Sequence, residues 1–222
     1  MDRYALISTK MPREFVLLQG TECRWRKCTF CDYHEDVSER PFEVNEPVLR
    51  QVTGQYGVLD VINSGSAMEL DEETIAFIKE VVKEKKIHTL WFEAHYMYRK
   101  KLASFAEQFA PVKVKFRCGV ETFDANLRDR WKKGIPSSVT PEDIAKYFQG
   151  VCLLLGTEGE SKEYAHEDPH WHETSNGNFK SNEDIVITLD GTVFYCYVFC
   201  VPEGILCVKN TVCKGAVLYV LE

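Results

Sequence analysis

Short apolar runs alternate along the chain with longer stretches in which apolar residues recur three and four positions apart. The short runs predict buried β-strands, and the longer stretches have the periodicity of amphipathic helices. The expected strands are residues 14–20, 57–66, 87–95, 112–121 and 151–156. The expected helices are residues 71–86, 97–110, 124–134 and 141–149. This regular alternation predicts an α/β protein with a parallel sheet, either open or curled into a partial or complete barrel.

The ends of the expected helices carry residues that commonly begin and end helices. Acidic residues crowd the first turn of 71–86 and lysines its last turn, which suits the helix dipole. Gly134 is expected to stop the helix at 124–134, and Thr140 is expected to be the N-cap of the helix at 141–149.

The pattern changes after Gly156. The following stretch is polar and rich in Asn, Gly, Ser and His, which predicts a long loop or an irregular cover. Residues 185–200 predict a β-hairpin whose two-residue turn is Asp190-Gly191, and residues 204–222 predict one or two further strands. We therefore expect a single domain over 1–222, with a β/α core at 1–156, a loop or cover at 157–184 and C-terminal strands at 185–222.

Polar and apolar residues alternate within the strand expected at 112–121, so they lie on opposite faces of the sheet. Because helices cover the apolar outer face, the charged residues of the strand are expected on the inner face. These inner-face residues are Lys113, Lys115, Arg117, Gly119 and Glu121. Glu93, His95 and Glu121 fall at the carboxyl ends of strands, where ligands bind in such folds. Alternatively, each charge caps a strand end or forms a structural salt bridge.

Composition narrows the choice of compartment and ligand. The N-terminal residues contain no apolar segment typical of a secretion signal, and no stretch reaches the roughly 18 apolar residues of a membrane span. We therefore expect a cytoplasmic protein that does not engage a membrane. Nine cysteines in such a chain predict reduced thiols used for metal binding or catalysis. A net charge of −7 disfavours intact nucleic acid and favours a substrate of nucleotide size or smaller.

Three cysteines are concentrated in one loop directly after the first expected strand. Cys23, Cys28 and Cys31 form a C-x4-C-x2-C pattern. Three thiolates would hold an iron–sulfur cluster and leave one iron free for a small molecule. Alternatively, His34 would complete a Cys3His zinc site, or the thiols would simply be buried. The position at the mouth of the predicted barrel, with Phe30 between the last two cysteines, favours the iron–sulfur cluster.

On these residues the chain resembles the radical S-adenosylmethionine (SAM) enzymes, whose signature is three cysteines after the first barrel strand, typically C-x3-C-x-aromatic-C. Cys28-Thr29-Phe30-Cys31 fits this signature, although the first gap of the chain is one residue longer. Three later segments are similar to family motifs in the same chain order: Asn63-Ser64-Gly65-Ser66, the residues GVETFD at 119–124 and the residues LGTEGES at 155–161. The resemblance covers residues 14–161 and implies a partial (β/α)6-type barrel.

The resemblance implies that Cys23, Cys28 and Cys31 ligate a [4Fe–4S] cluster whose fourth iron is chelated by SAM. An external one-electron reductant of the flavodoxin or ferredoxin type would drive cleavage of SAM to a 5′-deoxyadenosyl radical, which abstracts a substrate hydrogen. The cofactor-binding residues implied are Phe30 and Tyr33 beside the adenine, Ser64, Gly65 and Ser66 at the methionine end, and Glu121 at the ribose. The residues left to face the substrate are Gln19, Glu93, His95, Lys115 and Arg117.

The first 150 residues are similar to one branch of that family, the queuine lyases of queuosine salvage, especially at 5–34, 58–75, 90–99 and 141–156. This resemblance implies a lyase that releases queuine from queuosine 5′-phosphate. A mixed inner face suits that substrate, with carboxylates for its amine and a lysine or arginine for its phosphate. The alternatives are a radical SAM enzyme acting on another pterin or deazapurine, and a zinc-stabilised binding module without activity.

Other cysteines and histidines have simpler interpretations. Cys196, Cys200, Cys207 and Cys213 could hold a second cluster, but cysteines on strands are commonly buried as small apolar residues. We favour this interpretation for them and for Cys118 and Cys152. His166, His170 and His172 are expected to be solvated surface residues.

Overall fold

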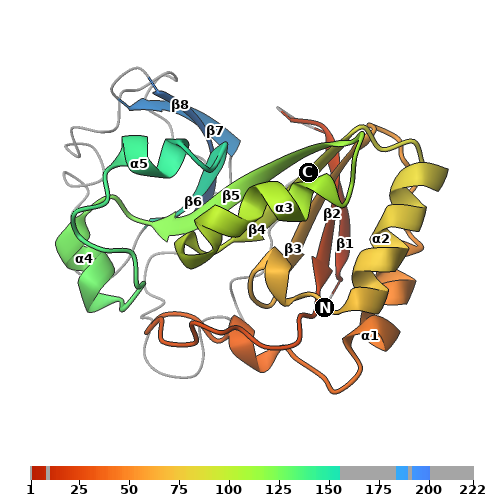
Figure 1. Ribbon diagram of the computed structural model, residues 1–222, viewed down its shortest axis with the longest axis horizontal. Helices are drawn as coiled ribbons and strands as arrows, with labels where there is room; N and C mark the ends of the chain where they lie inside the picture. The colour runs from red at the N-terminus through yellow and green to blue at the C-terminus, as the bar shows by residue number, and fades with distance from the viewer. Residues whose placement is uncertain (1, 9–10, 156–183, 190–191, 201–222) are drawn as a thin grey trace. The chain divides into compact units, whose positions relative to one another are not determined.

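The computed structural model describes residues 2–8, 11–155, 184–189 and 192–200 (Figure 1). Several expectations from the sequence lie outside these residues. They are the loop or cover expected at 157–184 except for its last residue, the turn Asp190-Gly191, the strands expected at 204–222, the histidines His166, His170 and His172, and the cysteines Cys207 and Cys213.

The chain divides into two compact units. The first comprises Met1–Arg26 and Asp32–Arg117, and the second comprises Lys27–Cys31 and the chain from Cys118 onward. Strand β5 (Lys113–Glu121) begins in the first unit and ends in the second.

The first unit contains a sheet with the strand order β1-β2-β3-β4-β5. Its strands are β1 (Tyr4–Ile7), β2 (Arg13–Leu18), β3 (Val58–Asn63), β4 (Thr89–Ala94) and the first part of β5. Strands β2, β3 and β4 pair in parallel, whereas β1 pairs antiparallel with β2 at the edge. The parallel pairing confirms the expectation of an α/β fold with a mostly parallel sheet.

The helices of the first unit connect the parallel strands (Figure 1). They are α1 (Pro41–Leu49), α2 (Glu72–Glu84) and α3 (Leu102–Glu107), with short 3-10 helices η1 (Tyr33–Glu35), η2 (Ala67–Glu69) and η3 (Tyr96–Lys101). Helix α2 begins as predicted, because the side chain of Asp71 accepts a hydrogen bond from Thr74 N–H at 2.8 Å. The helix expected at 97–110 is instead a 3-10 turn that continues into α3.

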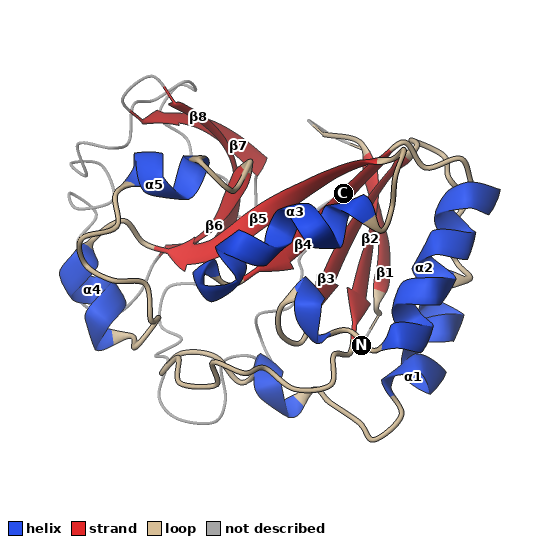
Figure 2. Cartoon of the chain, viewed as in Figure 1, coloured by secondary structure: helices blue, strands red, loops and turns tan. Residues whose placement is uncertain are grey.

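The second unit contains α4 (Ala125–Arg130), α5 (Pro141–Ala145), β6 (Gly150–Leu155), β7 (Asp184–Leu189) and β8 (Thr192–Cys200), shown in Figure 2. Strand β8 pairs parallel with β6 and antiparallel with β7, which confirms the strand pairing of the expected hairpin. Thr140 caps α5 as predicted. Helix α4 ends before Gly134 because Lys132 already has a φ of +53°.

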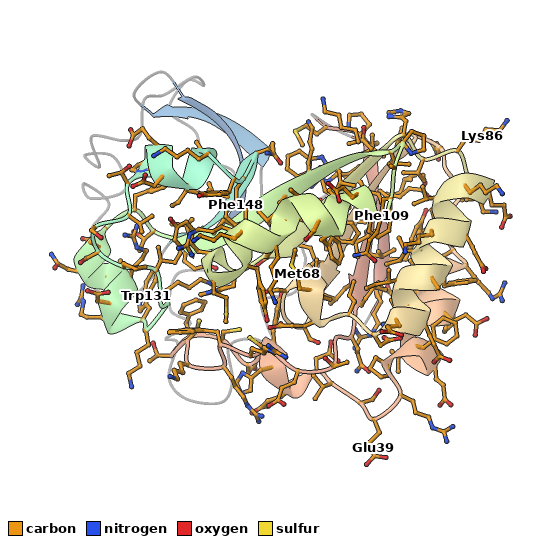
Figure 3. All side chains as sticks on the ribbon, viewed as in Figure 1. Glu39, Met68, Lys86, Phe109, Trp131 and Phe148 are labelled. Carbon is orange, nitrogen blue, oxygen red and sulfur yellow. The ribbon has the colours of Figure 1, made fainter. Side chains whose placement is uncertain are left out.

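The strands of the first unit separate apolar and charged side chains as the alternation predicted. The rings of Phe92 and Phe116 lie 5.3 and 6.1 Å from the ring of Phe105 on α3, on the outer face of the sheet. Phe109, labelled in Figure 3, belongs to the same aromatic cluster. Their sequence neighbours Trp91 and Arg117 point to the other face, where the guanidinium of Arg117 lies 5.3 Å from the ring of Trp91.

The inner face of this sheet carries a buried ionic triad. Asp60 is fully buried and accepts hydrogen bonds at 2.9 Å from Arg13 and from Arg117, whose side chains are 1% and 2% exposed. Burial alone would raise the pKa of Asp60, but the charges of Arg117 and Arg13 outweigh burial and hold this pKa below its ordinary value. Three strands are thereby joined at one carboxylate.

Replacing the carboxylate of Asp60 should therefore destabilise the folded protein. We expect Asp60→Asn to lower the free energy of unfolding by about 3–5 kcal/mol, because two buried guanidinium groups lose their ion pair with Asp60. Urea titration at neutral pH measures this loss.

The matched control is Glu39→Gln, because Glu39 is exposed and points away from the protein (Figure 3). Since the pKa of Asp60 is lowered by folding, its contribution is present above the ordinary value of 3.8 and is lost as the pH falls through the folded value. The difference between wild type and Asp60→Asn should thus shrink in acid, and a difference independent of pH would contradict this account.

Candidate functional site

Cys23 lies in a loop of the first unit whose start is fixed by backbone contacts. Both the N–H and the hydroxyl of Thr21 donate to the carbonyl oxygen of Glu69, at 2.8 and 3.0 Å. The N–H of Arg26 donates to the sulfur of Cys23 at 3.5 Å, and Arg26 has a left-handed φ of +42°. Hydrogen bonds to sulfur are a common feature of cysteines that ligate metals, so the local backbone suits that role.

The predicted segment Ser64-Gly65-Ser66 lies against this loop. The N–H of Gly20 donates to the hydroxyl of Ser64 at 2.8 Å. A Cβ atom on Gly65 would lie 3.3 Å from the Cα of Cys23 and only 2.2 Å from a carboxylate oxygen of Glu69. Glycine is therefore required here by the close approach of the loop, and the structure brings this predicted segment to the first cysteine.

Glu69 is a buried residue of this site that the sequence analysis missed. Its carboxylate accepts hydrogen bonds from Arg24 N–H at 3.0 Å, Ser66 N–H at 2.6 Å and the Tyr98 hydroxyl at 2.7 Å. Burial, and then the bond to Glu69 and its negative charge, raise the pKa of Tyr98. The spacing Ser66-x-x-Glu69 is that of a capping box, which is the one sequence signal that could have found it.

His95 also lies at this loop, as the N-cap of η3. Its N–H donates to the hydroxyl of Ser66 at 3.0 Å, and its Nδ1 accepts from Met97 N–H at 3.2 Å. The ring of Trp25 is stacked on the imidazole with centroids 5.2 Å apart and an interplanar angle of 14°. Trp25 lies in the first gap between cysteines, which is one residue longer than the family pattern, and the sequence did not single it out.

Gln19 is held by a short chain of polar contacts. Its Nε2 donates to Asp36 at 2.8 Å, and Asp36 accepts from the guanidinium of Arg3 through both carboxylate oxygens. Burial opposes the hydrogen bonds from Arg3 and Gln19, but these bonds win and lower the pKa of Asp36. Because Nε2 is committed to Asp36, the amide oxygen of Gln19 points elsewhere, and it is buried with no hydrogen-bond partner in the part of the chain described.

The other predicted substrate residues lie on the same strands. Glu93 on β4 and Lys115 on β5 are half-buried, whereas Arg117 belongs to the triad with Asp60. The ammonium of Lys115 lies 4.8 Å from the ring of Trp91, and burial together with the charge of Lys113 lowers its pKa. The residues predicted beside adenine or zinc, Tyr33 and His34, lie half-buried in η1.

In the second unit, the segment around Phe30 is attached to the residues that follow α4. The N–H of Thr29 donates to the carbonyl oxygen of Trp131 at 3.0 Å. The rings of Phe30 and Trp131 meet edge to face with centroids 5.5 Å apart. The ammonium of Lys133 lies 5.4 Å from the ring of Phe30 and donates to Glu121 at 2.8 Å. Lys133 thus contacts two predicted cofactor residues, although the sequence analysis did not select it.

Glu121 has an unusual backbone conformation for its residue type. Its φ is +67°, in the left-handed region that non-glycine residues rarely adopt, and its side chain is 9% exposed. Such strain persists only where surrounding contacts enforce it, and it is concentrated at functional sites. The ion pair with Lys133 is one contact that holds Glu121 in place.

The cysteines of the predicted cluster are all reduced and partly exposed. Cys23 belongs to the first unit, and Cys28 and Cys31 belong to the second. Over the described ranges, no group of three or more His, Cys, Asp or Glu residues is placed to hold a metal ion. Metal ligation therefore stays a prediction from cysteine spacing and chemistry.

Cys118 and Cys152 are buried, as expected. None of the helices that the structure describes is long and apolar enough to cross a membrane.

The pair Lys133–Glu121 generates a stability prediction. We expect Lys133→Met, which keeps the apolar stem, to lower the free energy of unfolding by roughly 2 kcal/mol, because it leaves the Glu121 carboxylate buried without its partner. Lys146→Met is the matched control, because its pair with Asp143 is 64% and 36% exposed and is screened by water. Denaturant titration of both variants tests this, and equal stabilities would contradict a buried role for Lys133.

No protein-family model matches the chain, and no curated protein matches it either. The chain is similar to the solved structure of a queuine lyase from Clostridium spiroforme bound to SAM and queuine. The two chains are 42% identical with a TM-score of 0.71, and the match covers 76% of this chain and 74% of that chain. An identity this high over most of both chains agrees with the cysteine motif and the parallel sheet, so the protein belongs to the queuine lyase branch of the radical SAM enzymes.

Proposed function

We propose that the protein is a radical SAM lyase that releases queuine from queuosine 5′-phosphate. The observation that carries this proposal is the 42% identity to a queuine lyase bound to SAM and queuine. We further propose that residues 1–222 form one domain, a partial (β/α)6-type barrel with a β-hairpin in its C-terminal segment.

The chemistry of the three cysteines fits a [4Fe–4S] cluster. None of Cys23, Cys28 and Cys31 forms a disulfide within the described residues, and a backbone N–H is directed at the sulfur of Cys23. When bound, the cluster would supply the electron for reductive cleavage of SAM at the iron that lacks a cysteine ligand. The electron would come from an external reductant of the flavodoxin or ferredoxin type.

We propose the following residues as those that bind SAM. Ser64, Gly65 and Ser66 would bind its methionine end, since their backbone passes beside the first cysteine. Phe30 and Tyr33 would flank the adenine, and Glu121 would accept hydrogen bonds from the ribose hydroxyls. Glu69 would fix the backbone of Ser66, and Lys133 would hold the carboxylate of Glu121, so that each group is oriented before the cofactor binds.

The inner face of the sheet would hold the substrate. Glu93 would face the secondary amine of the queuine moiety, with His95 beside it. The buried amide oxygen of Gln19 still needs a donor, and an N–H of the base would provide one. Lys115 would face the phosphate, because it is a half-buried cation on this face and a lysine makes charge-assisted hydrogen bonds to phosphate, and Arg117 lies on the same face of β5.

Removal of any of the three cysteines should abolish cofactor chemistry. We expect Cys23→Ala, Cys28→Ala and Cys31→Ala to lose most iron and sulfide after anaerobic reconstitution and to make no 5′-deoxyadenosine. Cys118→Ala is the control, because this buried cysteine should leave cluster content unchanged. Stoichiometric zinc without iron in the wild-type protein would instead support the zinc module and overturn the proposal.

The phosphate contact predicts a preference between substrates. Under anaerobic reducing conditions with SAM, we expect queuine release from queuosine 5′-phosphate with a lower KM than from queuosine. Lys115→Met should reduce this preference roughly tenfold, because one charge-assisted hydrogen bond is lost. Lys113→Met is the matched control, because Lys113 lies on the same face of β5 but is exposed.

Two outcomes separate the parts of this proposal. Formation of 5′-deoxyadenosine without queuine would show radical chemistry on a different substrate, such as another deazapurine or a pterin. An unchanged preference in Lys115→Met would remove Lys115 from the phosphate site while leaving the lyase activity established.

A further inference from the structure

We infer that Glu69 is a positioning residue that fixes the cysteine loop, defined here as Thr21–Arg26, against the serine–glycine segment Ser64–Ser66, and thereby sets the affinity for SAM. The inference rests on the proposed function, because it assigns the serine–glycine segment to the methionine end of SAM. It adds a residue that lies outside both the cysteine motif and that segment.

The two carboxylate oxygens of Glu69 serve different segments. Oε1 accepts from Arg24 N–H at 3.0 Å and from the Tyr98 hydroxyl at 2.7 Å. Oε2 accepts from Ser66 N–H at 2.6 Å. One carboxylate therefore spans the gap between the loop that contains Cys23 and the backbone beside the predicted methionine site.

The backbone of Glu69 strengthens the same connection. Its carbonyl oxygen accepts from both the N–H and the hydroxyl of Thr21, at 2.8 and 3.0 Å. Glu69 thus holds the cysteine loop on both sides of Cys23, at Thr21 through its carbonyl and at Arg24 through its carboxylate. A displacement of Glu69 would move the first cysteine.

A helix cap alone does not account for these contacts. A capping-box carboxylate needs only the N–H of the N-cap residue, here Ser66. The second oxygen of Glu69 instead reaches Arg24, which is 45 positions away in the sequence. Oε2 also lies close to Gly65, where an added Cβ would be 2.2 Å from it.

The donor pattern makes glutamine a sharp probe of this role. An amide has one acceptor oxygen, whereas both oxygens of Glu69 receive hydrogen bonds. If the amide oxygen faces Arg24 and Tyr98, the NH2 group must face the N–H of Ser66, and two donors then oppose each other. Glu69→Gln therefore keeps the size of the side chain but disconnects one of the two segments.

The structure offers a closely matched control in Glu14. This fully buried carboxylate also accepts from two backbone N–H groups, of Thr53 at 2.6 Å and Gly54 at 2.7 Å. It also accepts from a tyrosine hydroxyl, that of Tyr4, at 2.8 Å. Glu14→Gln thus removes the same kind of network from a place that does not contact the cysteine loop.

The test measures SAM binding to anaerobically reconstituted protein without reductant, by equilibrium dialysis, together with iron content and thermal stability. We expect Glu69→Gln to weaken SAM binding roughly tenfold or more at unchanged iron content, the fold-change for losing one hydrogen bond to a charged group. Glu14→Gln should lower thermal stability and leave the dissociation constant of SAM unchanged. Equal SAM affinities of the two variants would overturn the inference and leave Glu69 a structural residue.

If Glu69→Gln does not fold, a second pair of variants tests the positioning role of Glu69. Tyr98→Phe removes one donor from Oε1 and keeps both backbone contacts, so SAM binding should weaken severalfold, whereas Tyr4→Phe should leave it unchanged. Identical SAM affinities of these two variants would also overturn the inference. A wild-type protein that takes up no iron or binds no SAM would instead refute the proposed function itself, so the two failures are distinguishable.

Discussion

The strict alternation of side chains along β-strands is the constraint on which the first unit depends. Its outer face packs Phe92 and Phe116 against α3, so every second residue of the same strands must point to the inner face. Charged residues are stable there only where partners meet them. Arg13 and Arg117 form ion pairs with Asp60, and these pairs allow the inner face to carry buried charged residues.

The same constraint explains why the candidate site lies at the ends of these strands. Parallel pairing of β2 with β3 brings Gly20, two positions after β2, within hydrogen-bonding distance of Ser64, the first residue after β3. The residue after β4, His95, then reaches Ser66. Backbone N–H groups that no longer pair within the sheet need acceptors, and the hydroxyls of the serine–glycine segment provide them. The backbone N–H groups beyond the ends of the strands therefore hold the polar loop in place.

Local sequence patterns made most of the fold predictable, but they did not predict contacts between segments that are distant in the sequence. The caps Asp71 and Thr140, the alternation along β5 and the cysteine motif are all readable from neighbouring residues. Helix α1 was missed because Pro47 lies inside it and its apolar periodicity is weak. Glu69 and Lys133 were missed for another reason. Glu69 accepts from Arg24 N–H, 45 positions away, and Lys133 lies against the ring of Phe30. The capping-box spacing marks Glu69 as part of a helix start, but neither it nor a single basic residue reveals contacts with distant segments.

In each unit a charged residue holds a cysteine segment, and the two residues, Glu69 and Lys133, have opposite charges. In the first unit, the negative Glu69 gathers neutral donors, two backbone N–H groups and a hydroxyl, which fixes backbone positions. In the second unit, the positive Lys133 contacts the carboxylate of Glu121 and the ring of Phe30, which fixes side chains. A carboxylate suits the loop because free N–H groups are its natural donors, whereas an ammonium suits an aromatic ring and an acid. The charge of Glu69 and of Lys133 thus suits the groups that each residue contacts. Each role can be recognised only when the fold shows which segments lie together.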